Sequence, residues 1–186
     1  MQTEVTKKLF TVDEYYRMAD AGILTEDDRV ELIDGEIIEM SPVGNRHRAC
    51  VHRANTFFTE ALGRTAIVSN QSPLRLSNYT EPVPDVIVLK PVSDFYASRE
   101  CRPEDVFFLV EVSDTTLKYD KNLKLPRYAA AGVAEVWIED LKNDLFLVFR
   151  NPADKTFKTS SVLYRGDAIS PLAFPKVTFK VTDLLG

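Results

Sequence analysis

The sequence predicts a single α/β (α+β) domain, in which helices flank a mixed central β-sheet. The chain has 186 residues, the usual size of one domain, and it contains no internal repeat, low-complexity tract or Gly/Ser linker. Segments with helical and with β spacing alternate along it. The segment Val106–Ser113 holds a continuous apolar run, which is typical of a strand covered on both faces. We therefore expect residues 1–186 to form one domain.

The N-terminal part predicts a helix followed by a hairpin. Thr11 and Glu14 have the spacing of a capping box, so a helix should begin after Thr11 and stop near Gly22. The pair Asp34-Gly35 lies between two β-favouring runs and predicts a hairpin with a two-residue turn. In that register Glu31 pairs with Ile38.

The remaining elements follow from spacing and from turn residues. Apolar residues recur at helical spacing over residues 46–62, which predicts a second helix. A third helix is expected over 118–131, where Pro126 forces a kink or a late start. Strands are predicted at residues 67–69, 72–76, 85–89, 106–113, 135–138 and 145–149. The part from Asn151 onward looks β-rich and could cover a sheet edge or form a dimer contact.

Composition and charge exclude several classes of protein. Lys and Arg number 23 against 28 Asp and Glu, so a net charge of −5 argues against a broad nucleic-acid surface but leaves room for a small basic patch. The longest apolar run is far shorter than the ~20 residues that a membrane span requires. The first residues lack the apolar core of a signal peptide. We therefore expect a cytoplasmic protein that has no membrane partner.

The helix over residues 46–62 carries the densest basic cluster. Arg46, Arg48 and Arg53 could contact phosphates or could form a solvated face, and the sequence does not decide between these interpretations. His47 and Cys50, three residues apart, could also be two zinc ligands. A hydrogen-bonded histidine at the helix start is favoured, because zinc sites need three or four ligands, usually with tight paired spacings.

Two apolar strands carry isolated carboxylates. Asp85 begins one predicted strand, and Glu111 lies near the end of another, on the same face as buried apolar residues, where an unpaired charge is costly. Mg²⁺ is usually held by one or two carboxylates together with water and phosphate oxygens, and two neighbouring strands can supply those carboxylates. Lys124, on the following helix, could offset charge that develops on a phosphate, and Tyr128 lies one turn further on the same face.

Several segments resemble the Uma family of endonucleases, which belongs to the PD-(D/E)XK restriction-endonuclease-like superfamily. The resemblance extends from about Phe10 to about Arg150. The segments that carry it, in chain order, are Val30-Glu31-Leu32-Ile33-Asp34-Gly35-Glu36, Glu81-Pro82-Val83-Pro84-Asp85-Val86, Glu111-Val112-Ser113, Tyr119-Asp120 with Lys124 and Tyr128, and Ala131-Gly132-Val133-Ala134-Glu135-Val136-Trp137.

This resemblance implies a restriction-endonuclease-like core and Mg²⁺- or Mn²⁺-dependent hydrolysis of DNA phosphodiester bonds. Asp85 and Glu111 match the two motif acids, and Glu31 matches an early acid that often serves as an auxiliary metal ligand. Ser113 occupies the position of the motif lysine, which implies that Lys124 has taken over that function from the next helix. Gln71, which is expected on a strand between Glu31 and Asp85, and Ser113 are expected as supporting polar contacts. A homodimer is expected by analogy with enzymes that cut both strands.

Two other functions remain open at this point. Ser113 in the place of the motif lysine would suit a catalytically inactive nuclease fold that binds nucleic acid or a protein. Paired carboxylates also serve glycoside hydrolysis, which is insensitive to chelators because it uses proton transfer rather than a metal.

Overall fold

A six-stranded mixed sheet forms the centre of the computed structural model, which describes residues 6–25 and 27–186. The strand order is β3-β4-β5-β6-β7-β8, in which β5 and β6 run parallel and the other neighbours antiparallel. The strands are β3 (Ile67–Asn70), β4 (Val86–Leu89), β5 (Val106–Ser113), β6 (Glu135–Asp140), β7 (Leu145–Ala153) and β8 (Thr156–Tyr164). The predicted mixed sheet is therefore confirmed.

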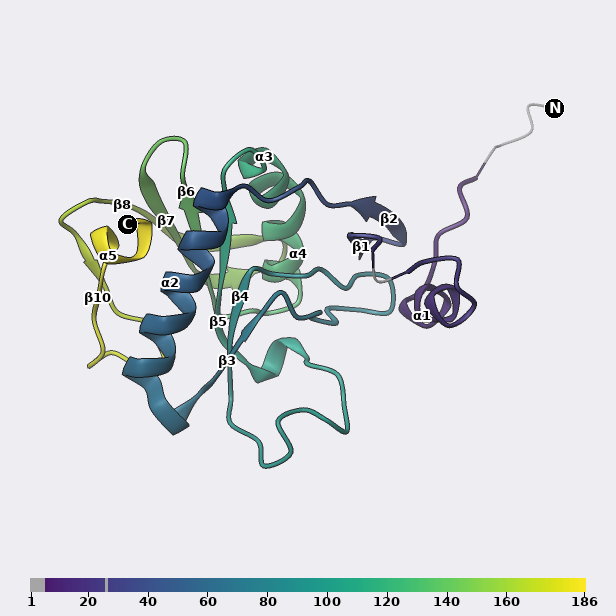
Figure 1. Ribbon diagram of the computed structural model, residues 1–186, viewed down its shortest axis with the longest axis horizontal. Coiled ribbons are helices and arrows are strands. Elements are labelled where there is room, and N and C mark those ends of the chain that lie inside the picture. Colours follow the sequence, from purple (N-terminus) through teal and green to yellow (C-terminus); the bar gives the residue numbers. More distant parts are fainter. Residues whose placement is uncertain (1–5, 26) are drawn as a thin grey trace.

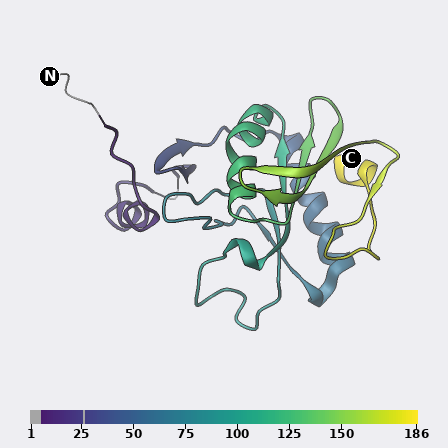
Figure 2. The same cartoon turned by 180° about the vertical axis from the view of Figure 1, so that it is seen from behind.

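Helices cover both faces of this sheet (Figures 1 and 2). One face packs against α2 (Asn45–Leu62) and α5 (Val181–Leu185), which follows the short strands β9 (Ala168–Ile169) and β10 (Phe179–Lys180). The other face packs against the continuous helical segment made of α3 (Leu117–Tyr119), the π-helix η3 (Asp120–Lys124) and α4 (Leu125–Ala130). Two short 3₁₀ turns, η1 (Gly63–Thr65) and η2 (Pro103–Asp105), precede β3 and β5.

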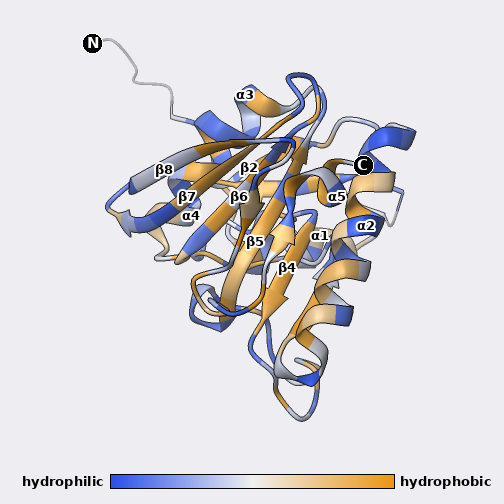
Figure 3. Ribbon diagram, turned by 90° about the vertical axis from the view of Figure 1, so that its left-hand side faces the viewer, coloured by the Kyte–Doolittle hydropathy of each residue, from blue (hydrophilic) through white to orange (hydrophobic). Residues whose placement is uncertain are grey.

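The core lies along β4 and β5, which are hydrophobic along most of their length (Figure 3). Their apolar residues alternate between the two faces of the sheet. Phe108, Val110 and Val112 of β5 face α2, whereas Leu109 packs on the α4 side. On the α2 side, the ring of Phe108 lies 5.2 Å from that of Phe58 and 4.5 Å from that of Trp137, centroid to centroid. The continuous apolar run of β5 is therefore explained by burial on both faces, as the sequence predicted.

The N-terminal helix and hairpin lie to one side of the sheet (Figure 1). Helix α1 (Val12–Asp20) begins with the predicted capping box of Thr11 and Glu14. Strands β1 (Val30–Ile33) and β2 (Glu36–Glu39) form a separate two-stranded sheet with Glu31 opposite Ile38, as predicted.

The turn of this hairpin packs tightly against the segment before α1. Asp34 and Gly35 both have positive φ, 51° and 78°. A Cβ atom on Gly35 would lie 2.7 Å from the Cβ of Leu9, so a larger residue would fit neither the conformation nor the space. Backbone hydrogen bonds from Gly35 N–H to Tyr79 O and from Glu81 N–H to Leu32 O, together with the ion pair of Asp34 with Arg127, join the hairpin to neighbouring segments.

Two local predictions differ from the structure. Residues 72–76 form no strand; Leu74 N–H bonds to Pro82 O and Leu76 N–H to Thr80 O, while Pro73 has no N–H to give to a ladder. The helix predicted over residues 118–131 exists, but it contains a π turn, and Pro126 lies in the first turn of α4, where a missing N–H costs little.

No helix among residues 6–25 and 27–186 has the length and apolar character needed to cross a bilayer.

Candidate active site

A cavity of about 690 Å³ opens where β4 begins and β5 ends, between the sheet, the β1–β2 hairpin and the start of α2. The helical segment on the opposite side of the sheet contributes Tyr119, Asp120 and Lys124 to its wall. Five of the predicted site residues line the same cavity, namely Glu31, Gln71, Asp85, Glu111 and Lys124, and His47 lines it as well.

Asp85 and Glu111 lie side by side because of the strand register. Val86 pairs with Val110, so the residues just before and after them, Asp85 and Glu111, meet at the end of the antiparallel pair. Asp85 Oδ2 accepts hydrogen bonds from the backbone N–H of Val112 at 2.8 Å and from His47 Nε2 at 3.1 Å. These contacts fix the carboxylate at the mouth of the strand pair.

Glu111 is buried, with 2% of its surface exposed. Its Oε1 atom lies 2.8 Å from Lys124 Nζ and accepts a hydrogen bond of 2.5 Å from the hydroxyl of Tyr128. Burial raises the pKa of Glu111 to about 8, since the nearby carboxylates of Asp120 and Asp85 add to the effect and Lys124 only partly opposes it. Glu111 is therefore a carboxyl group that a bound cation would strongly favour in its charged form.

Lys124 holds its ammonium group among acceptors although only 4% of the residue is exposed. Its Nζ atom lies 2.8 Å from Glu111, 3.4 Å from Glu31 and 3.3 Å from Val83 O. Burial alone would lower the pKa of this amine, but the carboxylates of Glu111 and Glu31 outweigh it and raise the pKa above its ordinary value. Lys124 therefore stays positively charged.

Glu31 comes from the hairpin and already has partners at both oxygens. Its Oε1 accepts a hydrogen bond from Tyr119 Oη at 2.7 Å, and its Oε2 accepts one from Val83 N–H at 2.9 Å. With Lys124 near the same Oε2, these contacts point to a carboxylate that holds the lysine in place. Its predicted role as an auxiliary metal ligand stays a prediction.

The two supporting residues occupy different places. Gln71 lines the cavity just after β3 with a φ of 48°, rather than on a strand as predicted, and its backbone N–H donates to Asp85 O. Ser113 is fully buried, and its hydroxyl donates to Asp120 Oδ2 at 2.6 Å. Ser113 thus anchors η3, the turn that contains Lys124.

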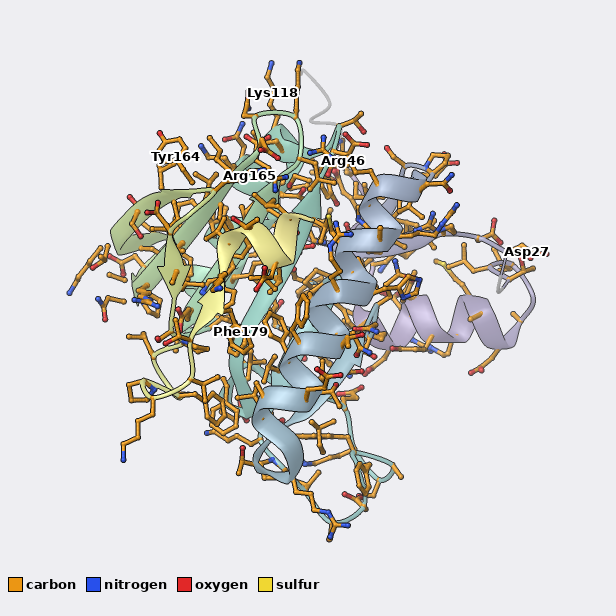
Figure 4. All side chains as sticks on the ribbon, turned by 60° about the vertical axis from the view of Figure 1, so that its left-hand side comes forward. Asp27, Arg46, Lys118, Tyr164, Arg165 and Phe179 are labelled. Carbon is orange, nitrogen blue, oxygen red and sulfur yellow. The ribbon has the colours of Figure 1, made fainter. Side chains whose placement is uncertain are left out.

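The three arginines of α2 have partners of their own. Arg46 donates to Leu141 O and pairs with Asp144, which also pairs with Arg165; Figure 4 shows these two arginines close together. Arg48 bonds to the carbonyl of Val43. None of the three lines the cavity, so phosphate contact by them stays a prediction.

Arg53 makes its contacts within the fold, to the backbone of α5. Its guanidinium donates to Leu184 O and Leu185 O, which joins α2 to α5. These contacts favour a structural role for Arg53.

Sequence reasoning missed His47, Tyr119 and Asp120 as parts of the site. His47 is bonded, as expected of a histidine at a helix start, but its partner is Asp85 inside the cavity. Asp120 accepts hydrogen bonds from Ser113 and Thr116, and burial raises its pKa. A signal for the last two existed, because Tyr119-Asp120 was among the segments that carried the family resemblance.

A model of the Uma2 family, described as "Putative restriction endonuclease", matches residues 12–182. The chain belongs to this family. A solved structure of a "putative nuclease belonging to DUF820" from Anabaena variabilis is similar over 95% of this chain and 97% of that one, with a TM-score of 0.72 and 18% identity. That likeness shows the fold, which the two chains share over nearly their whole length. No protein with a curated description matches the chain.

The carboxylates of this family member fit a hard cation. Among residues 6–25 and 27–186, no three His, Cys, Asp or Glu side chains are grouped as ligands of one ion. Mg²⁺ needs only one or two protein carboxylates, because water and phosphate oxygens complete its coordination. Asp85 and Glu111, paired at the cavity floor, can supply them. The zinc alternative has little support, because Cys50 contacts Leu185 O and Arg53 on the α2 side of the sheet.

Proposed function

We propose that this protein is an endonuclease that hydrolyses DNA phosphodiester bonds with Mg²⁺ or Mn²⁺ held by Asp85 and Glu111. The observation that carries the proposal is the position of the Lys124 ammonium, 2.8 Å from Glu111, in the cavity that Asp85 also lines. A restriction-endonuclease family and a nuclease-like fold agree with it.

The chemistry divides between a metal and the side chains of the chain. A bound metal would lower the pKa of a water molecule and stabilise charge on a phosphate oxygen. Lys124 would orient the attacking water and offset the negative charge that develops on the phosphate. Glu31 and Tyr119 would keep Lys124 in place, and His47 would do the same for Asp85. Ser113 and Gln71 would support the site from outside the reacting groups.

Mn²⁺ titration of the wild type and of Asp85→Asn tests the proposal. Calorimetry and melting temperature both report binding, since a ligand of the native state stabilises it. We expect binding in the wild type, little or none in Asp85→Asn, and normal binding in Glu104→Gln, a matched loss of one exposed carboxylate. Equal binding by the wild type and Asp85→Asn would place the metal elsewhere and contradict the proposal.

Cleavage of plasmid DNA and of single-stranded DNA then separates an enzyme from a binding module. We expect cleavage by the wild type and by Glu104→Gln, and a loss of at least about 100-fold in Asp85→Asn. DNA binding without cleavage, with metal bound, would support the inactive module instead. Activity that survives a chelator would favour a metal-free hydrolase.

Two copies of the chain are part of the proposal, because cutting both strands of a duplex suits two active sites related by a two-fold axis. Sedimentation velocity tests this point, and a monomer with undiminished duplex cleavage would contradict it.

A further inference from the structure

A second, smaller cavity of about 210 Å³ lies beside the candidate active site, between α1, the loop before β1 and the segment before β4. Its lining includes Tyr15, Tyr16, Leu24, Pro73, Glu81 and Val83. Its volume is below the ~300–1,000 Å³ of cavities that enclose drug-sized ligands. It therefore suits one flat ring system.

Val83 and Asp28 line both cavities, so the two spaces are neighbours. Val83 lies between the two cavities. On the side of the active site, its N–H donates to Glu31 and its C=O accepts from Lys124. A nucleotide whose phosphate lay at Asp85 and Glu111 would thus have the smaller cavity within reach of its base.

The small cavity presents two aromatic rings and a buried carboxyl group. The rings of Tyr15 and Tyr16 lie 5.8 Å apart, edge to face, and the hydroxyl of Tyr15 is fixed by a hydrogen bond of 3.2 Å to Val30 O. Glu81 is 3% exposed; its carboxyl group accepts one hydrogen bond from the hydroxyl of Tyr16, and its remaining acceptor positions have no such partner among the lining residues. Aromatic side chains are the usual stacking partners of unpaired bases, and a carboxylate accepts hydrogen bonds from amino groups on base edges.

The charges of this cavity argue against a phosphate as its occupant. No Lys or Arg is among its lining residues, all of which belong to the described part of the chain, whereas Asp28 and Glu81 are acidic. A neutral ring with an amino group meets these surroundings without charge repulsion. An anion would have no partner there.

We propose, on the basis of the nuclease function above, that this cavity receives one unstacked nucleobase of the DNA strand that is cut. Tyr16 stacks on the base, and Glu81 accepts a hydrogen bond from its amino group. A base within a duplex must first be unpaired and unstacked, which costs free energy, so the favoured substrate is single-stranded or locally unpaired DNA. The same arrangement favours bases with an exocyclic amino group over thymine.

The test measures binding of twelve-nucleotide single strands to Asp85→Asn protein, which keeps the DNA intact. A strand that contains 2-aminopurine reports stacking by loss of its fluorescence. In this background we expect Tyr16→Ala to weaken binding about tenfold or more and to remove the fluorescence change. Tyr16→Phe keeps the ring but loses the hydrogen bond to Glu81, so it should keep the fluorescence change and most of the affinity. Tyr164→Ala, a control at an exposed tyrosine on β8, should bind normally.

Three further results complete the test. Single strands should bind more tightly than the matching duplex, and Glu81→Gln should reduce the preference for deoxycytidine over thymidine strands. Equal affinities of Tyr16→Ala and Tyr164→Ala would overturn the base site while metal-dependent cleavage by the wild type left the nuclease function intact. Fluorescence loss in the wild-type background without any cleavage would support the base site and contradict the nuclease function alone.

Discussion

Two buried ion pairs lie on neighbouring strands, and they differ in ways that separate a working site from a structural contact. Glu111 of β5 meets Lys124, and Glu135 of β6 meets Arg150. The carboxylate of Glu135 accepts hydrogen bonds from three donors, namely Arg150 Nε at 2.7 Å, Trp137 Nε1 at 2.7 Å and Leu172 N–H at 2.6 Å. Glu111 instead lines a cavity and has two other acids, Asp85 and Asp120, nearby.

The difference teaches that burial alone does not mark a site. Every donor around Glu135 ties it to another segment of the fold, so its charge is neutralised within the protein. Around Glu111, carboxyl groups outnumber the one ammonium group of Lys124, and the pKa of Glu111 is raised to about 8, so a bound cation would be needed to keep all of these groups ionised. An excess of carboxyl groups that face a cavity is the feature that distinguishes the two pairs.

Replacement of Glu111 and of Glu135 by glutamine tests the difference between the two pairs most directly. We expect Glu111→Gln to lower DNA cleavage at least about 100-fold and to leave the melting temperature nearly unchanged or higher, because it removes a buried carboxyl group whose ionisation is costly while Lys124 keeps Glu31 as a partner. Glu135→Gln should keep activity per folded molecule but lose about 3–5 kcal/mol of unfolding free energy, because Arg150 loses its charged partner. Urea denaturation and cleavage assays on the same samples check both halves; a swapped pattern would contradict the assignment.

The cation of the working pair gives the second prediction. Lys124→Met keeps the aliphatic stem but removes the charge between Glu111 and Glu31, so we expect turnover to fall about 100-fold while Mn²⁺ binding is kept or strengthened. Lys121→Met, an exposed lysine in the same turn, is the matched control and should be silent. Turnover unchanged in Lys124→Met would show that the lysine only neutralises its neighbours.

The pH dependence of stability sharpens the comparison with a third buried carboxyl group, Glu139. Both of its oxygens lack a hydrogen-bond partner in the described part of the chain, and burial raises its pKa to about 8, as for Glu111. A folded-state pKa above the unfolded value stabilises the protein below pH 4.5, and this contribution is lost as the pH rises through 8. Each such group therefore lowers the unfolding free energy by about 1.4 kcal/mol per pH unit in that window.

Glu139→Gln tests this sign, because the amide cannot ionise. Without added metal, the melting temperature of the wild type should fall from pH 6 to pH 8, and the variant should fall less steeply, by a few degrees. Parallel curves for the two proteins would show that Glu139 is ionised or paired throughout.

Features set by residues close together in the sequence were predicted better than features that depend on distant segments. Thr11 with Glu14 and Asp34 with Gly35 are signals whose partners lie a few residues away, and both predictions are confirmed. Residues 72–76 looked like a strand, yet no neighbouring strand pairs with them. Pairing depends on distant segments, which a local pattern does not contain.

The same distinction applies to the candidate site. Asp85 and Glu111 were predictable because each is an isolated acidic residue at the end of a predicted apolar strand, which is visible in the sequence. The hydrogen bond from His47 to Asp85 was not, since 38 residues separate them and only the packing of α2 brings them together. Lys124 was a candidate on its chemistry, and the family resemblance gave it the role of the motif lysine. Its exact place could not be predicted from helical spacing, because a π turn changes which face of the helix a residue occupies.

The hairpin that supplies Glu31 also has a consequence for motion. It forms a two-stranded sheet of its own, outside the central ladder, and is held by backbone hydrogen bonds to residues 79–81 and by side-chain contacts of Glu31 and Asp34. A segment held by loop and side-chain contacts opens more readily than a strand paired on both sides in the central ladder, so the hairpin should open while β4 and β5 stay folded. Amide hydrogen exchange at Leu32 should then be faster than at Val110. Such an opening would uncover both cavities at once and give a long DNA strand a way in without threading.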